Sequence, residues 1–145
     1  MIASWSRGNW IGRESCLKVA EPAFLLDSNV CIHILDDAAS LAALRVQECA
    51  PGSVVTSAIV YAEVVRGVAP DRDGLAKLDA LFDVIPVLPF DAPAALAYAR
   101  LAFRRGTFDR LIGAHALSLG LTLVTSNERD FAGIPQLRIE NWTRQ

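Results

Sequence analysis

The sequence has no long apolar run, although apolar residues are abundant in it. Hydrophobic residues make up 52% of the 145 positions, and the mean hydropathy is +0.31. They are spread over many short runs, none close to the roughly 20 consecutive apolar residues that span a bilayer. We therefore expect no transmembrane helix and no secretory signal. The apolar content instead predicts a well-filled core and an apolar surface that receives a partner.

An excess of basic residues is also missing, and so is a paired set of cysteines. The formal net charge of −2 excludes a globally basic nucleic-acid coat protein, but not an enzyme that gathers carboxylates around a metal. The three cysteines, Cys16, Cys31 and Cys49, are odd in number and fit no metal-ligand pair. A disulfide framework is not expected, which indicates a reducing, cytoplasmic compartment.

Neither histidine has a serine or cysteine nucleophile beside it in a recognisable pattern, so a triad hydrolase is not expected. His115 lies among apolar neighbours such as Ile112 and Ala116. We interpret it as a hydrogen-bonded structural histidine, and His33 in the same way.

The first 22 residues differ from the rest of the chain. They contain Trp5 and Trp10 but no helical or strand period. We interpret residues 1–22 as an N-terminal extension, either a disordered leader or an over-long start-codon assignment; the alternative is an arm that docks on a partner. Residues 23–145 are expected to form one domain.

Short apolar runs typical of buried strands alternate with helical stretches along this domain. Strands are expected at 24–26, 54–55, 84–88, 121–125 and 137–139, and helices at 29–35, 41–49, 58–68, 74–82, 92–104 and 109–119. Pro86 favours an edge strand, Ser57 a helix N-cap and Gly120 a helix C-cap. The alternation predicts an α/β fold with three α/β/α layers and a short, mainly parallel sheet.

Acidic and amide side chains follow the expected strands. Asp27 comes directly after the first strand, and Asn127 and Asp130 follow the strand at 121–125. Glu63 and Asp109 lie on helices that follow a strand or a turn. Because functional groups of open parallel sheets gather at the carboxyl ends of the strands, these side chains are expected to converge at one edge.

Each of these residues also has a purely structural interpretation. Asp27 could only cap the following helix, Glu63 could be a solvent-facing residue, and Asp109 could only be a helix cap that also favours the helix dipole. Asn127 and Asp130, spaced i, i+3, could be surface turn residues. Glu63 is a lone charge in a strongly apolar helix, however, and a buried carboxylate needs a cation or a proton. Together the set favours a metal site.

Four stretches of the chain resemble PIN-domain nucleases, in order and with natural spacing. They are residues 24–32, residues 56–63, residues 108–117 followed by 121–127, and residues 133–142. Over about residues 23 to 142 the chain looks like the VapC toxins of bacterial toxin–antitoxin pairs. It departs from the family at Ser28, where threonine is common, and at Asn127, where many PIN domains carry an acid.

The resemblance implies a Mg²⁺-dependent endoribonuclease, with Mn²⁺ as a substitute, that cleaves tRNA or rRNA. It also implies a homodimer inhibited by a cognate VapB-like antitoxin. Hard Mg²⁺ prefers oxygen ligands, so we expect Asp27 and Asp109 to bind it directly. Glu63 would act through water or orient the attacking water, and Asp130 or Asn127 would complete the shell.

Alternatives remain open for the RNA contacts and for the activity. Tyr61 and Phe108 could stack on bases, although core packing is the expectation for both. The rival activities are a phosphatase, which would need an acid where Asn29 stands, an RNA-processing PIN nuclease, and a non-catalytic RNA-binding PIN domain. Apolar stretches at 35–44 and 58–68 are expected to receive the antitoxin. The candidate phosphate ligands are Arg66, Arg104, Arg105, Arg110 and Arg129.

Overall fold

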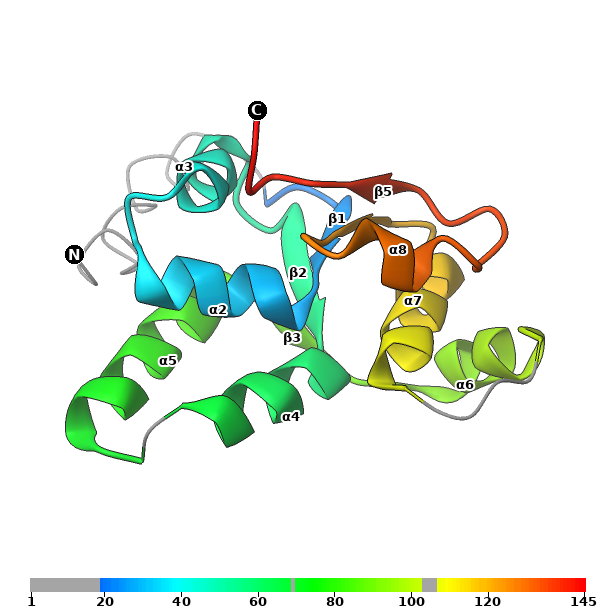
Figure 1. The fold of residues 1–145 in the computed structure, drawn as a ribbon, viewed down its shortest axis with the longest axis horizontal. Coiled ribbons are helices and arrows are strands. Elements are labelled where there is room, and N and C mark those ends of the chain that lie inside the picture. Colours follow the sequence, from blue (N-terminus) through cyan, green and yellow to red (C-terminus); the bar gives the residue numbers. More distant parts are fainter. Residues whose placement is uncertain (1–18, 69, 103–106) are drawn as a thin grey trace.

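A computed structural model describes residues 19–68, 70–102 and 107–145 of the chain (Figure 1). Strands and helices alternate in it, as the sequence pattern predicts. The strands are β1 (Phe24–Leu26), β2 (Val54–Ser57), β3 (Val87–Leu88), β4 (Thr122–Val124) and β5 (Ile139–Glu140). The helices are α2 (Ser28–Asp36), α3 (Leu41–Glu48), α4 (Ala58–Gly67), α5 (Arg72–Val84), α6 (Ala92–Ala99), α7 (Phe108–Leu119) and α8 (Glu128–Phe131).

The strands form one parallel sheet in the order β3-β2-β1-β4-β5. β1 is the central strand, and Phe24 pairs with Val54 of β2 on one side and with Thr122 of β4 on the other. Leu25 and Leu123 are fully buried because helices cover both faces of the sheet. The predicted α/β/α architecture is confirmed.

The layers are visible in Figure 1, where the strands run through the middle of the molecule. Helices α2, α3 and α5 lie on the left of this view and α6, α7 and α8 on the right. The chain leaves β1 toward β2, whereas β4 lies on the other side of β1. The strand order therefore reverses at the carboxyl ends of β1 and β4, the usual place of a functional site in such a sheet.

Several local predictions are confirmed by hydrogen bonds at the ends of elements. The Ser57 hydroxyl accepts from the Ile59 N–H at 3.1 Å and caps α4. Gly120 ends α7 in the left-handed region, at φ 68°, which glycine adopts without a steric cost. The strand that follows Pro86 lies at the edge of the sheet, as proline requires.

Two helices differ from the prediction by two residues or more, and one of them, α5, also runs to Val84, so Val84 is not in the strand expected at 84–88. The helix expected at 92–104 ends at Ala99, because the Leu101 N–H turns back to the Tyr98 carbonyl and the Leu101 side chain packs against the core. The helix expected at 74–82 starts earlier, at Arg72, because the Asp71 carboxylate accepts from the N–H of Gly74 at 2.7 Å. No periodic pattern in the sequence predicts either contact.

The described part of the chain begins at Val19, within the predicted N-terminal extension. The Ala20 N–H donates to the Pro51 carbonyl at 2.9 Å, so this residue of the predicted extension is hydrogen-bonded to the domain. Residues 1–18 of the predicted extension, with Cys16, lie outside the described residues. Cys31 and Cys49 are both free thiols. No helix in the described ranges is long and apolar enough to cross a membrane.

Candidate active site

Asp27 stands at the carboxyl end of β1 and is 1% exposed. Its Oδ1 accepts from the Ser28 N–H at 2.7 Å and caps α2. Its Oδ2 accepts from the Thr125 hydroxyl at 2.8 Å. Burial raises the pKa of Asp27, while the hydrogen bonds from Thr125 and Ser28 oppose that rise. The capping alternative is thus correct but incomplete, because the second oxygen is held from another strand.

Thr125 is a site residue that the sequence analysis missed. It is fully buried at the end of β4, and its Oγ1 both donates to Asp27 and accepts from the Asn127 N–H at 3.0 Å. It therefore ties the carboxyl ends of β1 and β4 together. A hydroxyl residue directly after an apolar strand was the available signal, but only the strand order places it beside Asp27.

Glu63 lies in the second turn of α4 with one carboxylate oxygen inside the protein. Its Oε1 is buried and makes no hydrogen bond within the described part of the chain. Burial, followed by the charges of Asp27 and Asp109, raises the pKa of Glu63, whereas the Ser28 hydroxyl opposes the rise. The solvent-facing alternative is wrong for this oxygen. An unpaired buried carboxylate oxygen requires a proton or a cation.

Asp109 occupies the first turn of α7, one residue after the helix begins. Thr107 holds the N-cap position, so Asp109 is not the cap. Burial, followed by the charges of Asp27 and Asp130, raises the pKa of Asp109. Asp109 therefore lies within electrostatic reach of two other carboxylates that are far away in the sequence.

Asp130 and Asn127 lie on either side of the start of α8. Both are exposed, and the Asp130 N–H donates to the Asn127 carbonyl at 3.1 Å. The charge of Asp130 raises the pKa of Asp27 and of Asp109. Asn127 contacts the site through its backbone N–H, which donates to the Thr125 hydroxyl. The structure thus groups Asp130 with the other carboxylates through its charge, and Asn127 through its backbone.

Asp27, Glu63, Asp109 and Asp130 form a carboxylate cluster in which the charges act on one another. Within residues 19–68, 70–102 and 107–145, no three His, Cys, Asp or Glu side chains stand close enough to form a ready metal cage. An open set of oxygen donors fits Mg²⁺, which keeps several of its waters and takes only a few carboxylates. A cation would also satisfy the buried Glu63 oxygen.

The family is decided by comparison with known proteins. Residues 24–137 match the family model of the PIN domain. The chain belongs to the PIN domain family.

Relatives of this PIN domain extend over nearly its whole length. The tRNA(fMet)-specific endonuclease VapC of Shigella flexneri is 32% identical over 131 residues, which cover 83% of this chain and 98% of the relative. Ribonuclease VapC2 of Rickettsia felis is 28% identical over 132 residues, covering 83% and 98%. The crystal structure of DNA-bound VapBC from Salmonella typhimurium superposes with a TM-score of 0.73 and 30% identity, over 83% of this chain and 98% of that one.

The arginines of this PIN domain divide into two groups. Arg110 is buried, and its guanidinium donates to the Ala102 carbonyl at 2.7 Å. The prediction that Arg110 contacts RNA is therefore wrong, because this side chain is hydrogen-bonded to the segment that follows α6. Arg66 and Arg129 are exposed and stay candidates, while Arg104 and Arg105 lie outside the described residues.

The two aromatic candidates also differ. The Tyr61 ring packs edge-on against Phe82, with ring centroids 4.9 Å apart, but it is 38% exposed, so it is not the core residue that was expected. Phe108 is 54% exposed beside Asp109, so its expected core packing is wrong.

The histidines differ as well. His115 is buried, and its Nδ1 lies 2.7 Å from the Ser57 hydroxyl, which confirms a hydrogen-bonded structural histidine. His33 is exposed on α2, so the same expectation is wrong for His33.

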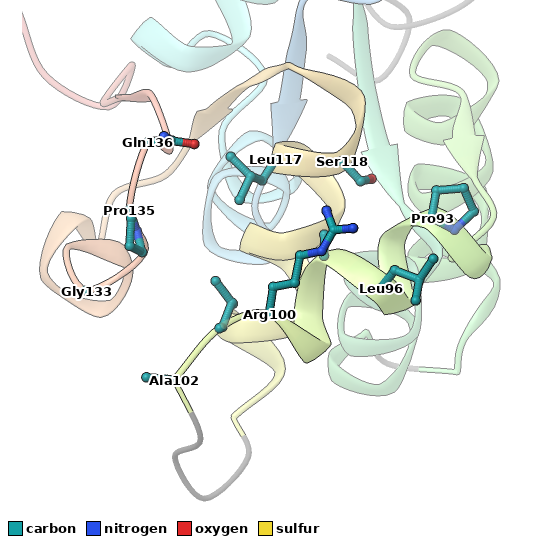
Figure 2. A pocket seen from close by; sticks show the side chains of 11 residues that line it. Pro93, Leu96, Arg100, Ala102, Leu117, Ser118, Gly133, Pro135 and Gln136 are labelled. Atoms are coloured by element: carbon teal, nitrogen blue, oxygen red, sulfur yellow. The ribbon is translucent and has the colours of Figure 1, made fainter.

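A cavity of about 660 Å³ lies away from the carboxylates, between α6, the C-terminal half of α7 and residues 133–136. Figure 2 shows Arg100 at its centre, with Pro93 and Leu96 on one side and Pro135 and Gln136 on the other. None of the clustered acids lines it. The active-site proposal therefore depends on the cluster and not on this cavity.

Proposed function

We propose that this PIN domain is a divalent-metal-dependent endoribonuclease toxin of the VapC type. The observation that carries the proposal is the carboxylate cluster at the carboxyl ends of β1 and β4. Three of its members have pKa values raised by burial and by one another's charge. The unpaired Glu63 oxygen and the similarity to VapC ribonucleases support it.

Mg²⁺ is the proposed ion, and Mn²⁺ would substitute for it. Asp27 and Asp109 would hold the ion directly, Glu63 through water, and Asp130 or Asn127 would complete the shell. When bound, such an ion lowers the pKa of a coordinated water and offsets charge on the phosphoryl group.

The chain's own residues supply position and proton transfer. The Thr125 and Ser28 hydrogen bonds hold the Asp27 carboxylate in one orientation. Glu63 orients the attacking water and accepts its proton. Water adds to phosphorus as the bond to the leaving 3′-oxygen breaks, and this oxygen takes a proton from solvent, which gives a 5′-phosphate and a 3′-hydroxyl. The exposed Arg66 and Arg129 would contact RNA phosphates, because a guanidinium pairs well with phosphate oxygens.

The proposed partner is a cognate VapB-like antitoxin that binds a homodimer of this chain. Similar solved structures are VapBC complexes from Salmonella typhimurium and Rickettsia felis, each bound to DNA. Leu41 and Leu44 on α3 and Val65 on α4 are exposed apolar residues. A cavity of about 320 Å³ between α2 and α5 suits an amphipathic partner helix, because its lining is both apolar and charged: Ile32, Leu35, Val68, Asp36, Asp71, Asp73 and Lys77. An antitoxin arginine that reached the acids would displace the metal.

The proposed substrate is a structured cellular RNA, tRNA or rRNA, so the activity would be cytoplasmic. Cleavage of tRNA and rRNA in the presence of Mg²⁺, with EDTA as the negative control, tests the reaction class. Asp109→Asn should lower kcat by about 100-fold or more, since several kcal/mol of charge stabilisation are lost.

The matched control is Asp73→Asn. Asp73 is also in the first turn of its helix, α5, but it is not among the acids that act on the cluster. This variant should cut RNA like the wild type. Equal activity of Asp109→Asn and Asp73→Asn would show that the site assignment is wrong, and cleavage in EDTA would exclude the metal. RNA fragments without 5′-phosphates would exclude water as the nucleophile.

A further inference from the structure

A buried hydrogen bond joins the two helices that carry Glu63 and Asp109. The Ser57 hydroxyl, at the N-cap of α4, lies 2.7 Å from Nδ1 of His115 in the middle of α7. Ser57 and His115 are 0% and 1% exposed. Both groups are thus removed from water and from any RNA, and their bond is a fixed link between α4 and α7.

The Ser57 hydroxyl can donate to Nδ1 or accept from it, depending on the His115 tautomer. Its oxygen already accepts from the Ile59 N–H at 3.1 Å, so its own hydrogen is available for Nδ1. Burial lowers the pKa of His115, although the Asp91 carboxylate opposes that shift. A neutral ring with its proton on Nε2 accepts at Nδ1, and the Phe90 ring holds it edge-on with ring centroids 5.4 Å apart.

The hydrogen bond between Ser57 and His115 is equally far, along the helices, from the two carboxylates. Glu63 lies six residues after Ser57, and Asp109 lies six residues before His115. At 1.5 Å of rise per residue each acid is about 9 Å along its helix from the link. Because α4 and α7 also pack against one another, a change at the link would move these rigid segments and alter the separation of the two acids.

We propose that Ser57 and His115 form a positioning pair that sets the separation of Glu63 and Asp109, and with it metal affinity and turnover. This inference rests on the proposed function. Neither residue touches RNA or the reacting atoms; both act through the helices. Outer residues that orient metal ligands typically change affinity or activity by about 10–100-fold when they are replaced.

Variants at the two positions separate the hydrogen bond from simple packing. His115→Leu removes the hydrogen-bonding nitrogen and fills the space with an apolar side chain of similar size. His115→Asn restores an acceptor at the position of Nδ1. Ser57→Ala removes the donor together with a helix cap, so its control is Ser40→Ala. Ser40 is also buried and caps α3, accepting from the Ala43 N–H at 3.2 Å.

Calorimetric titration with Mn²⁺ and steady-state RNA cleavage should be measured on each variant. We expect Ser57→Ala and His115→Leu each to weaken Mn²⁺ binding and lower kcat by about 10-fold, with KM for RNA unchanged. The double variant should be no worse than either single one, because both remove the same bond. His115→Asn should recover most of the loss. Ser40→Ala should be less stable but retain wild-type Mn²⁺ affinity and kcat.

Wild-type Mn²⁺ affinity and kcat in His115→Leu would overturn the proposal, as would losses that multiply in the double variant. If His115→Leu does not fold, equal Mn²⁺ affinity in Ser57→Ala and Ser40→Ala overturns it instead. A wild-type protein that binds Mn²⁺ but cuts no RNA would refute the proposed function alone, because the effect of the pair on affinity is still measured. A wild-type protein that binds no Mn²⁺ refutes both.

Discussion

Asp27 combines a structural and a chemical role in one side chain. One of its oxygens caps α2 and the other accepts from Thr125. The two roles make different demands, because a cap needs an oxygen acceptor whereas a metal needs the negative charge. Substitutions that keep one property and remove the other therefore separate the roles.

Asp27→Asn should abolish RNA cleavage with little loss of stability, since asparagine caps helices as well as aspartate does. Asp27→Ala should lose the activity and in addition about 1 kcal/mol of folding free energy. Urea unfolding and cleavage assays on both variants test this. Near wild-type cleavage by Asp27→Asn would remove Asp27 from the metal site, and equal stability of the two variants would refute its role as a cap.

The raised pKa values of Asp27, Glu63 and Asp109 predict how the stability of the metal-free protein depends on pH. A carboxyl group whose pKa is higher in the folded than in the unfolded state binds protons more readily when folded. Its contribution to the stability of the folded protein is fully present below its unfolded pKa of about 4. That contribution is lost as the pH rises through the pKa of the folded state. In EDTA the cluster should therefore lower the Tm at neutral and higher pH.

Asp109→Asn removes one of these charges, so in EDTA at pH 7 it should have a higher Tm than the wild type. A gain of about 1 kcal/mol in the free energy of unfolding corresponds to about 2–4 °C. Mn²⁺ should raise the Tm of the wild type but not that of the variant. Asp73→Asn provides the control. Wild-type melting that is unaffected by Mn²⁺ would count against a metal site.

At the scale of elements, α7 presents both an acid and an exposed ring at its N-terminus. Phe108 is 54% exposed and directly precedes Asp109. An unpaired RNA base can stack on such a ring, and the contribution is roughly 1–3 kcal/mol per base. The start of α7 would then position both the phosphate chemistry and a neighbouring base.

Phe108→Ala should therefore raise KM for an RNA loop by about fivefold or more, which corresponds to about 1 kcal/mol, while Phe108→Tyr should stay close to the wild type. Leu119→Ala, at the exposed far end of the same helix, is the control for loss of an apolar surface residue. Unchanged KM in Phe108→Ala would exclude the stacking role.

At the scale of the whole molecule, the match to the PIN domain begins at residue 24, after the N-terminal segment. Val19 is 69% exposed, and the Ala20 N–H donates to the Pro51 carbonyl. Deletion of residues 1–18 should leave RNA cleavage and stability unchanged. Deletion of residues 1–22 should also leave cleavage intact but cost about 1 kcal/mol for the lost hydrogen bond. Loss of folding in the shorter deletion would show that the segment is part of the domain.

The partner is the second prediction at this scale. Co-expression with the product of the adjacent open reading frame should give a complex that contains two copies of this chain and that cuts no RNA. Size-exclusion chromatography with light scattering gives the stoichiometry, and growth after induction of the chain alone gives the toxicity. A monomer that binds no such product and leaves growth unaffected would contradict the toxin role and would favour an RNA-processing nuclease.

The sequence by itself determined the fold class, and it also identified the acids proposed for the site. Short apolar runs between helical stretches require a parallel sheet covered on both faces, because β–helix–β connections return in the same direction. Asp27 and Glu63 were recognisable because a lone charge in an apolar stretch has a desolvation cost that calls for a function. Caps such as Ser57 and Gly120 depend on neighbours within a few residues, so they too could be predicted.

Only the tertiary structure decided which amphipathic side chains are inside and what they contact. Arg110 donates to Ala102 and lies inside, while Phe108 lies outside, although composition suggested the reverse for both. Thr125 holds Asp27 across 98 residues of chain, and His115 reaches Ser57 across 58. These contacts form where strand order and helix packing bring distant segments together. Residues so far apart in sequence leave no periodic pattern from which their pairing could be predicted.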